Sequence, residues 1–165
     1  MDIRLVRIDD RLIHGQVATV WTKHYQVNRI LVVSDSVAHD EMRKLLLVQA
    51  APPGVKVNVI PVQKLIDVFH DFHLFTSQAK VMLLFTNPKD VKQVVEAGVP
   101  IKEINVGGMS YQTGKKMITN AVAVDTQDCE DFKFLSQAGI KIEIRKVVAD
   151  NSIDLMQVLK KEKLI

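Results

Sequence analysis

Short apolar runs alternate with amphipathic segments along the whole chain. The runs are enriched in β-branched residues and are predicted to be strands. They lie at Ile3–Ile8, Ile30–Val33, Lys56–Ile60, Val81–Phe85, Glu103–Val106, Ala121–Val124 and Ile140–Ile144. Two of them, at 30–33 and 81–85, are apolar at every position, which is typical of parallel strands that are covered on both faces.

The segments between these runs carry apolar residues at helical spacing, three and four residues apart. Helices are predicted after Gly15 and at Met42–Gln49, Lys89–Ala97, Asp128–Gln137 and Ile153–Lys160. Capping signals support these limits. They are Asn87-Pro88, Asp125 or Thr126, and Ser152 at the starts, and Pro52-Pro53-Gly54 and Gly139 at the ends.

The alternation of strands and helices indicates an α/β fold. We expect a single-domain, open, twisted and mostly parallel sheet of about seven strands with helices on both faces. Only residues 106–119 lack a helical pattern, so a loop is expected between the strands on either side. In such sheets ligands bind beyond the carboxyl ends of the strands, so the residues that follow each strand are the candidate site residues.

The loop after the first strand is the richest in reactive side chains. It contributes the candidates Asp9, Asp10, Arg11, His14, Gly15 and Gln16. An imidazole can act as a nucleophile near neutral pH, and a guanidinium offers a planar fork to phosphate oxygens. The N–H groups that open the following helix also favour an anion. Either aspartate could orient His14 or hold Arg11, and a structural interpretation, in which Arg11 pairs with the aspartates and His14 caps the turn, fits the same spacing.

Further candidates follow other strands. Gly107, Gly108 and Met109 follow the fifth strand, where paired glycines either let the backbone approach a ligand or form a tight turn. Residues after the second and fourth strands are expected first as helix caps and secondly as lining of the site. They are Ser34, Asp35 and Thr86.

Nucleotide and metal sites receive no support from the sequence. Five residues separate Gly108 from Gly114, where a phosphate-binding loop needs four, and no GxGxxG motif occurs. His70 and His73 are three residues apart, but a metal site needs more ligands. Cys129 has acidic neighbours and is expected to be inert. We therefore expect neither a cofactor nor a metal.

Composition restricts the class of protein. A chain of 165 residues with 47% hydrophobic and 25% charged residues is typical of one soluble globular domain. No apolar run approaches the ~20 residues that span a bilayer, the charged N-terminus does not resemble a signal peptide, and a single cysteine permits a reducing cytoplasm. The net charge of +3 raises the possibility of nucleic acid, but 22 basic residues nearly match 19 acidic ones, and 5% aromatic residues offer few stacking platforms.

The stretch Arg7–Trp21, RIDDRLIHGQVATVW, closely resembles the enzyme IIB (EIIB) component of the mannose/fructose/sorbose family in the phosphoenolpyruvate-dependent sugar phosphotransferase system (PTS). The likeness continues in Gln49–Lys56, Leu84–Pro88 and Ile104–Met109 and covers essentially the whole chain. It implies an open, mostly parallel α/β sheet, in agreement with the alternation above. Because the chain begins almost directly with its first strand, we expect one EIIB domain over residues 1–165 that is not fused to EIIA.

The resemblance also implies roles for two residues. His14 matches the phosphorylated histidine of the family, which carries the phosphate on its δ1 nitrogen, and Arg11 matches the arginine expected to stabilise the phosphoryl group. The phosphoryl group arrives from a phosphohistidine on EIIA and leaves for a sugar that enters through the membrane components EIIC and EIID. A cytoplasmic location with peripheral attachment to the transporter follows, and a basic rim around His14 would attract an acidic EIIA surface.

Three alternatives are weighed against this interpretation. Gly107–Met109 looks more like the mannose, fructose and sorbose members than the amino-sugar members, which remain an alternative. Asp9-Asp10 resembles the acidic pair of a receiver-like signalling domain, but no acceptor aspartate follows the strand at Lys56–Ile60. A nucleic-acid-binding module would need clustered basic and aromatic residues, and the basic cluster is confined to Lys160–Lys163. Neither the sugar nor the oligomeric state is predicted.

Overall fold

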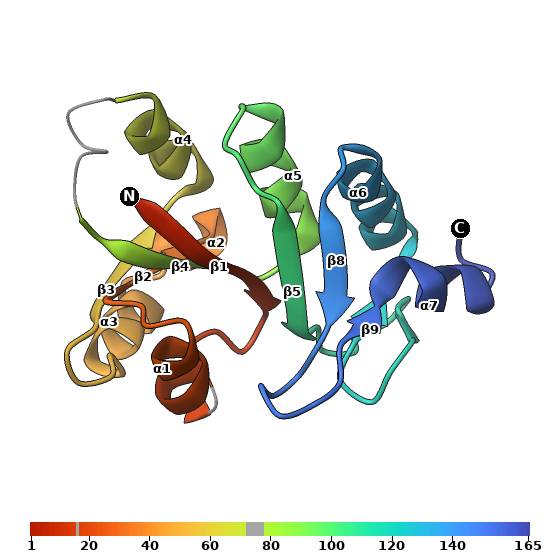
Figure 1. Ribbon diagram of the computed structural model, residues 1–165, viewed down its shortest axis with the longest axis horizontal. Helices are drawn as coiled ribbons and strands as arrows, with labels where there is room; N and C mark the ends of the chain where they lie inside the picture. Colours follow the sequence, from red (N-terminus) through yellow and green to blue (C-terminus); the bar gives the residue numbers. More distant parts are fainter. Residues whose placement is uncertain (16, 72–77) are drawn as a thin grey trace.

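Seven strands form one twisted sheet in residues 1–15, 17–71 and 78–165, which the computed structural model describes (Figure 1). The strand order is β3-β2-β4-β1-β5-β8-β9, and all neighbours are parallel except β8 and β9. The strands are β1 (Asp2–Asp9), β2 (Arg29–Val33), β3 (Lys56–Ile60), β4 (Lys80–Phe85), β5 (Glu103–Gly108), β8 (Lys141–Ile144) and β9 (Ile153–Asp154). The predicted mostly parallel α/β sheet is confirmed.

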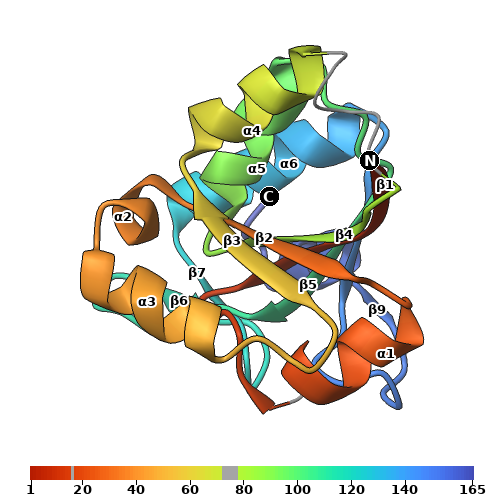
Figure 2. The ribbon, with the colours of Figure 1, turned by 90° about the vertical axis from the view of Figure 1, so that its left-hand side faces the viewer.

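Helices cover both faces of the sheet. They are α1 (Thr22–His24, preceded by the π-helical turn η1, Val17–Trp21), α2 (Asp35–Ala38), α3 (Glu41–Gln49), α4 (Val62–His70), α5 (Pro88–Glu96), α6 (Thr126–Gln137) and α7 (Leu155–Lys161). Figure 2 shows α4, α5 and α6 above the sheet and α1 and α3 below it. No helix in the described part of the chain combines the length and the apolar character that crossing a membrane requires.

Two apolar layers result, one on each face of the sheet. Leu31 and Val33 of β2 belong to the layer under α4, α5 and α6, while Ile30 and Val32 belong to the layer under η1 and α3. Successive residues of a strand point to opposite faces. A strand that is covered on both faces is therefore apolar throughout, which explains the run predicted at 30–33.

The predicted strand at Ala121–Val124 is wrong as a member of the main sheet. Its last two residues form β7 (Ala123–Val124), which pairs antiparallel with β6 (Lys116–Met117) in a separate two-stranded sheet. This hairpin folds back because Met109 exchanges backbone hydrogen bonds with Ala121 and Ala123, at 2.9 and 2.8 Å. The last position of the main sheet is taken instead by β9.

Several helix limits also differ from the prediction. The last helix begins at Leu155, where Asp154 rather than Ser152 accepts a hydrogen bond from the backbone N–H of Gln157, and residues 153–154 pair with β8 instead. The helices α2 and α4 were not predicted. The helix at 41–49 is confirmed, but its apolar stripe faces solvent: Leu47 is the residue that packs on the core, while Leu45 and Leu46 are exposed.

Candidate active site

The loop between β1 and α1 lies at a reversal in the topology of the sheet. After β1 the chain crosses to the face that carries α1 and α3, whereas after β4 and β5, the two neighbours of β1, it crosses to the opposite face. Such a reversal leaves a crevice beyond the carboxyl ends of adjacent strands, where ligands bind in open α/β sheets. The predicted location of the site, beyond the first strand, thus coincides with this switch point.

Asp9 is the centre of this loop. Its side chain is fully buried, and its Oδ2 lies 3.1 Å from Nε2 of His14, whose side chain is 26% exposed. Burial alone would raise the pKa of Asp9, but the charge of Arg7, the hydrogen bond and charge of His14 and the charge of Arg11 hold it below its usual value. Asp9 is therefore a carboxylate near neutral pH.

This contact determines which ring nitrogen of His14 is available. A carboxylate can only accept hydrogen bonds, so His14 donates from Nε2 to Asp9. The neutral ring then keeps its lone pair on Nδ1. Of the two aspartates that the sequence left open, Asp9 is the one that contacts His14, and Nδ1 is the ring nitrogen that this contact does not use.

Arg7 anchors Asp9 from inside the sheet. Its guanidinium is fully buried, donates to Asp9 Oδ2 at 2.8 Å and to the side-chain oxygen of Asn105, and stacks on Trp21 at 4.6 Å from the ring centroid. Burial lowers the pKa of Arg7, while Asp9 opposes the shift. Arginine stays protonated in proteins, so Arg7 and Asp9 form a buried ion pair.

Backbone carbonyls provide further acceptors for Arg7. The carbonyl oxygens of Arg145 and Lys146, directly after β8, each accept from the Arg7 guanidinium at 3.2 Å. The Lys146 carbonyl also accepts from the indole N–H of Trp21 at 3.3 Å. Three elements that are distant in the sequence, β1, η1 and the segment after β8, are thereby held together at the site.

The glycine pair at the end of β5 makes room for these charged groups. A Cβ at Gly107 would overlap with the Arg7 guanidinium and lie 2.5 Å from its Nη1, and a Cβ at Gly108 would lie 3.2 Å from Asp9 Oδ1. The pair ends a strand and does not form the tight turn weighed above. Its residues are glycine because the buried Arg7 and Asp9 occupy the adjacent space.

Arg11 and Asp10 have different roles in the loop. The Arg11 Nε and backbone N–H lie 3.3 Å from Asp9 Oδ1, and its side chain is 45% exposed, so the guanidinium is accessible while it is also ion-paired. The Asp10 carboxylate accepts from the backbone N–H and hydroxyl of Ser110, at 2.6 and 3.1 Å. Arg43 of α3 donates to the Asp10 carbonyl at 3.4 Å. Asp10 thus fastens the loop to its surroundings.

The backbone of the loop adopts one uncommon conformation. Leu12 has a φ of 60°, in the left-handed region, and its side chain is buried. This conformation costs a non-glycine residue about 1 kcal/mol, and burial of the leucine offsets that cost. Gly15 precedes a π-helical turn rather than the regular helix predicted after it. Gln16 lies outside the described residues.

The remaining predicted site residues make their hydrogen bonds outside the loop that follows β1. Ser34 is buried with its hydroxyl 3.2 Å from that of Ser36, and Asp35 accepts from the backbone N–H of Val62 at 2.8 Å, across to α4. Thr86 accepts from the Asn87 amide at 3.0 Å. In the described part of the chain no hydrogen bond joins these residues to the loop after β1. Met109 is buried and borders the groove described next.

A groove of about 270 Å³ lies beside the loop. Its lining includes the loop residues Asp10 and Arg11 and, from other segments, Ser110, Tyr111, Asn120 and Lys146. Sequence reasoning missed Arg7, Asn105, Ser110 and Lys146. A charged residue inside an apolar strand was a usable signal for Arg7, whereas nothing in the local sequence distinguishes Ser110 or Lys146.

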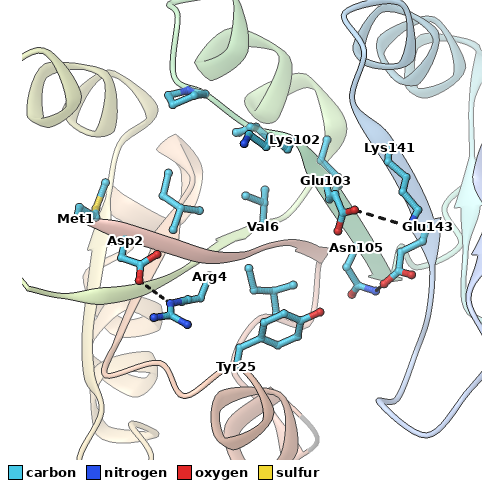
Figure 3. A pocket seen from close by; sticks show the side chains of 15 residues that line it. Met1, Asp2, Arg4, Val6, Tyr25, Lys102, Glu103, Asn105, Lys141 and Glu143 are labelled. Atoms are coloured by element: carbon cyan, nitrogen blue, oxygen red, sulfur yellow. Dashed lines mark hydrogen bonds and ion pairs between the residues drawn. The ribbon is translucent and has the colours of Figure 1, made fainter.

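A larger cavity, of about 680 Å³, lies beside the sheet at the amino-terminal ends of β1 and β5 (Figure 3). It extends over the amino-terminal halves of β1 and β5 and is bordered by Tyr25. Four of its charged groups form two ion pairs, Arg4–Asp2 at 2.6 Å and Lys141–Glu103 at 3.7 Å. Because ligands bind at the opposite ends of the strands in open α/β sheets, we do not assign the active site to this cavity.

The histidines and the cysteine outside the loop show no sign of a metal site or a reactive thiol in the described part of the chain. No group of three or more His, Cys, Asp or Glu side chains suited to a metal occurs among residues 1–15, 17–71 and 78–165. His70 Nε2 lies 3.0 Å from the Ala97 carbonyl oxygen, and His73 lies outside the described residues. Burial, Asp128 and other carboxylates raise the pKa of the Cys129 thiol, which fits the expectation that it is inert.

Comparison with known proteins shows which family the chain resembles. Residues 3–165 match the family model "PTS system sorbose subfamily IIB component". The chain is 53% identical over 161 residues to the mannose-specific EIIAB component of Escherichia coli K12, covering 98% of this chain and 49% of the relative, so it spans about half the length of the first relatives it matches. It is 47% identical over 156 residues to the sorbose-specific EIIB component of Klebsiella pneumoniae, covering 94% of each.

A solved structure shows the same architecture. The crystal structure of the IIBSor domain of the sorbose permease from Klebsiella pneumoniae matches with a TM-score of 0.93 and 45% identity, covering 98% of both chains. IIB components of this kind are phosphotransferases of the PTS. The match extends over nearly all of the fold, including β1 and the loop that follows it. This chain therefore belongs to the sorbose subfamily of PTS IIB components.

Proposed function

We propose that this protein is the phosphoryl carrier of a sugar-uptake phosphotransferase system, with His14 as the residue that carries the phosphoryl group. Nδ1 of His14 accepts the group from a phosphohistidine on EIIA and passes it to a sugar that enters through EIIC and EIID. The observation that carries this proposal is the hydrogen bond of 3.1 Å between His14 Nε2 and the buried Asp9. It leaves Nδ1 unprotonated on a partly exposed ring.

The first transfer needs no proton movement within this protein. The lone pair of Nδ1 forms a new P–N bond while the P–N bond to the donor imidazole breaks, and the electron pair of that bond returns to the donor ring. His14 retains its proton on Nε2, so its ring becomes positively charged. The Asp9 carboxylate stabilises this charge at hydrogen-bond distance.

The second transfer reverses these changes. A sugar hydroxyl forms the new P–O bond and releases its proton to solvent, while the P–N bond at Nδ1 breaks and its electron pair returns to His14. Phosphoryl transfer depends chiefly on in-line positioning and charge stabilisation. The half-exposed Arg11 guanidinium is placed in the groove beside the loop and supplies such charge to the phosphoryl oxygens.

The sugar and the location belong to the same proposal. Identities of 53, 47 and 46% to relatives named for mannose, sorbose and fructose exceed the 37% to a relative named for N-acetylgalactosamine. These values favour a sugar of the mannose, fructose or sorbose type over an amino sugar. We place the protein in the cytoplasm, bound peripherally to its membrane partners, on the basis of the family that it belongs to.

The experiment that tests this function supplies labelled phosphoenolpyruvate, the general phosphotransferase proteins and the cognate EIIA. Label should appear on this chain as an acid-labile, base-stable phosphohistidine. His14→Ala should remove it, whereas His39→Ala, at an exposed histidine on the end of α2, should label like the wild type. Normal labelling of His14→Ala would refute the proposal.

Arg11 is tested in the same assay. Arg11→Ala should slow labelling about 100-fold, the size typical of a lost charge-stabilising donor. The unfolding temperature should change little, because the side chain is half exposed. A normal rate with a lowered unfolding temperature would make Arg11 a structural residue.

A further inference from the structure

Exposed apolar side chains gather around the loop that follows β1. In the described part of the chain, nine large apolar side chains are exposed, and six of them lie on α3 or on the segment between β5 and β7. These six are Met42, Leu45, Leu46, Val48, Tyr111 and Met117, with exposures from 43 to 67%. Isolated exposed apolar residues are ordinary, but a cluster beside a functional loop indicates an interaction surface.

The helix α3 presents a continuous apolar stripe to solvent. Met42, Leu45 and Leu46 are spaced three and four residues apart and share one face of the helix. The helix packs on the core through Leu47, so the stripe contributes nothing to that contact. We call Met42, Leu45 and Leu46, together with Tyr111 and Met117, the apolar collar.

Both parts of the collar are attached to the loop through Asp10. Its carbonyl accepts from Arg43 of α3 at 3.4 Å, and its carboxylate accepts from Ser110 at 2.6 Å and 3.1 Å. In Figure 1 the loop that follows β1 lies between α3 and the segment that follows β5. A partner that reaches His14 therefore meets the loop at the centre of the collar.

Positive charge accompanies the collar. Arg11 and Lys146 line the groove beside the loop, and Arg43 is exposed on α3 next to the stripe. Before the first transfer these cations face a donor that carries the phosphoryl group. After the transfer the phosphate on His14 neutralises part of this charge. The unphosphorylated protein is thus complementary to a phosphorylated donor and loses that complementarity when the donor has reacted.

We infer that the apolar collar is the docking surface for phosphorylated EIIA, which would present an apolar patch with an acidic rim around its phosphohistidine. This inference rests on the function proposed above. Because the donor must leave after each transfer, the contact is expected to be small and transient, below about 1,200 Å² in total. A few of the collar residues would then account for most of the specificity for the donor.

The test compares substitutions of two exposed apolar residues, one inside the collar and one outside it. Leu46→Asp places a charge in the stripe, where Leu46 is 57% exposed, and Ile153→Asp does the same on β9, where Ile153 is 48% exposed. Labelling is measured with phosphorylated EIIA as donor and with phosphoramidate, a small donor that needs no docking surface. Leu46→Asp should raise the KM for phosphorylated EIIA tenfold or more with little change in kcat. Its labelling by phosphoramidate should stay within twofold of wild type, and Ile153→Asp should behave like wild type with both donors.

Each other outcome overturns the inference. An unchanged KM for Leu46→Asp, or an equal rise for Ile153→Asp, would show that the collar does not bind the donor. A normal KM together with a change in sedimentation would assign the collar to a second copy of this chain, and a defect confined to transfer into sugar in membrane vesicles would assign it to a membrane component. Failure of the proposed function gives a different result, because wild type would then not be labelled on His14 by either donor.

Discussion

Gly107→Ala should disrupt the buried ion pair that positions Asp9. The added Cβ would overlap with the Arg7 guanidinium and lie 2.5 Å from Nη1, where an ordinary contact needs about 3.5 Å. The guanidinium has no free space, since Asp9, Asn105 and Trp21 contact it on other sides. Arg7 must therefore leave its position, and the buried Asp9 loses its fully buried cationic partner.

The size of the effect follows from the loss of that ion pair. Removing one partner of a buried pair costs about 3–5 kcal/mol. In a domain of this length, each kcal/mol lowers the unfolding temperature by about 2–4 °C, so Gly107→Ala should lower it by about 6–20 °C. Labelling of His14 should slow as well, because Asp9, which contacts the His14 ring, loses the group that positions it.

Two controls make this test specific. Gly108→Ala would bring a Cβ to 3.2 Å from Asp9 and 3.4 Å from Arg11, which a small shift relieves, so its cost should stay within about 1 kcal/mol. In an Arg7→Met background, Gly107→Ala should cost far less than in the wild type, because the two changes share one contact. Thermal unfolding and the labelling assay measure both. If Gly107→Ala unfolds within about 2 °C of wild type and labels normally, the packing argument is wrong.

Three further predictions concern charge and the thiol. The folded pKa of Asp9 lies below its unfolded value, so its contribution to stability is present above the unfolded pKa and is lost as the pH falls through the folded pKa. The urea midpoints of wild type and Asp9→Asn should therefore converge between pH 7 and pH 3, and a constant difference between them would contradict this. Lys146→Gln should slow transfer from phosphorylated EIIA about 3- to 10-fold and weaken its salt dependence, because Lys146 lines the groove beside the loop. Lys141→Gln, at a lysine that pairs with Glu103, should change neither, and equal effects of the two substitutions would show that Lys146 is not part of the site. The Cys129 thiol should react with a disulfide reagent at neutral pH only after unfolding, since burial raises its pKa; rapid reaction in the folded protein would contradict its burial.

The fold was predictable where local pattern and tertiary environment agree. The runs at 30–33 and 81–85 became central strands because both faces of the sheet are covered there. The prediction of a main-sheet strand at 121–124 was wrong because a short strand in a separate hairpin can have the same β-branched pattern as a strand of the main sheet. The stripe at 42–49 predicts a helix correctly, but spacing gives only the period and not the direction in which the stripe faces.

The loop that carries the candidate site was predictable from the sequence, but the buried residues that hold it in place were not. Asp9, Arg11 and His14 lie within six consecutive positions, so the loop that carries them could be recognised from the sequence. Arg7 occurs in the same strand as Arg4, and period-two alternation does not show that Arg7 is fully buried while the Arg4 side chain is 39% exposed. The burial of Arg7 depends on groups 98 and 138 residues away in the sequence, which no local pattern contains.

The central claim, that Asp9 holds Nε2 of His14 and leaves Nδ1 to carry the phosphoryl group, is tested most directly by NMR of the phosphorylated protein. The position of the phosphate on the ring is determined from the ¹⁵N chemical shifts and ³¹P couplings of His14 after labelling from phosphorylated EIIA. The geometry predicts phosphate on Nδ1 and a proton retained on Nε2 with Asp9 as its acceptor. Phosphate on Nε2, or on any residue other than His14, would contradict it.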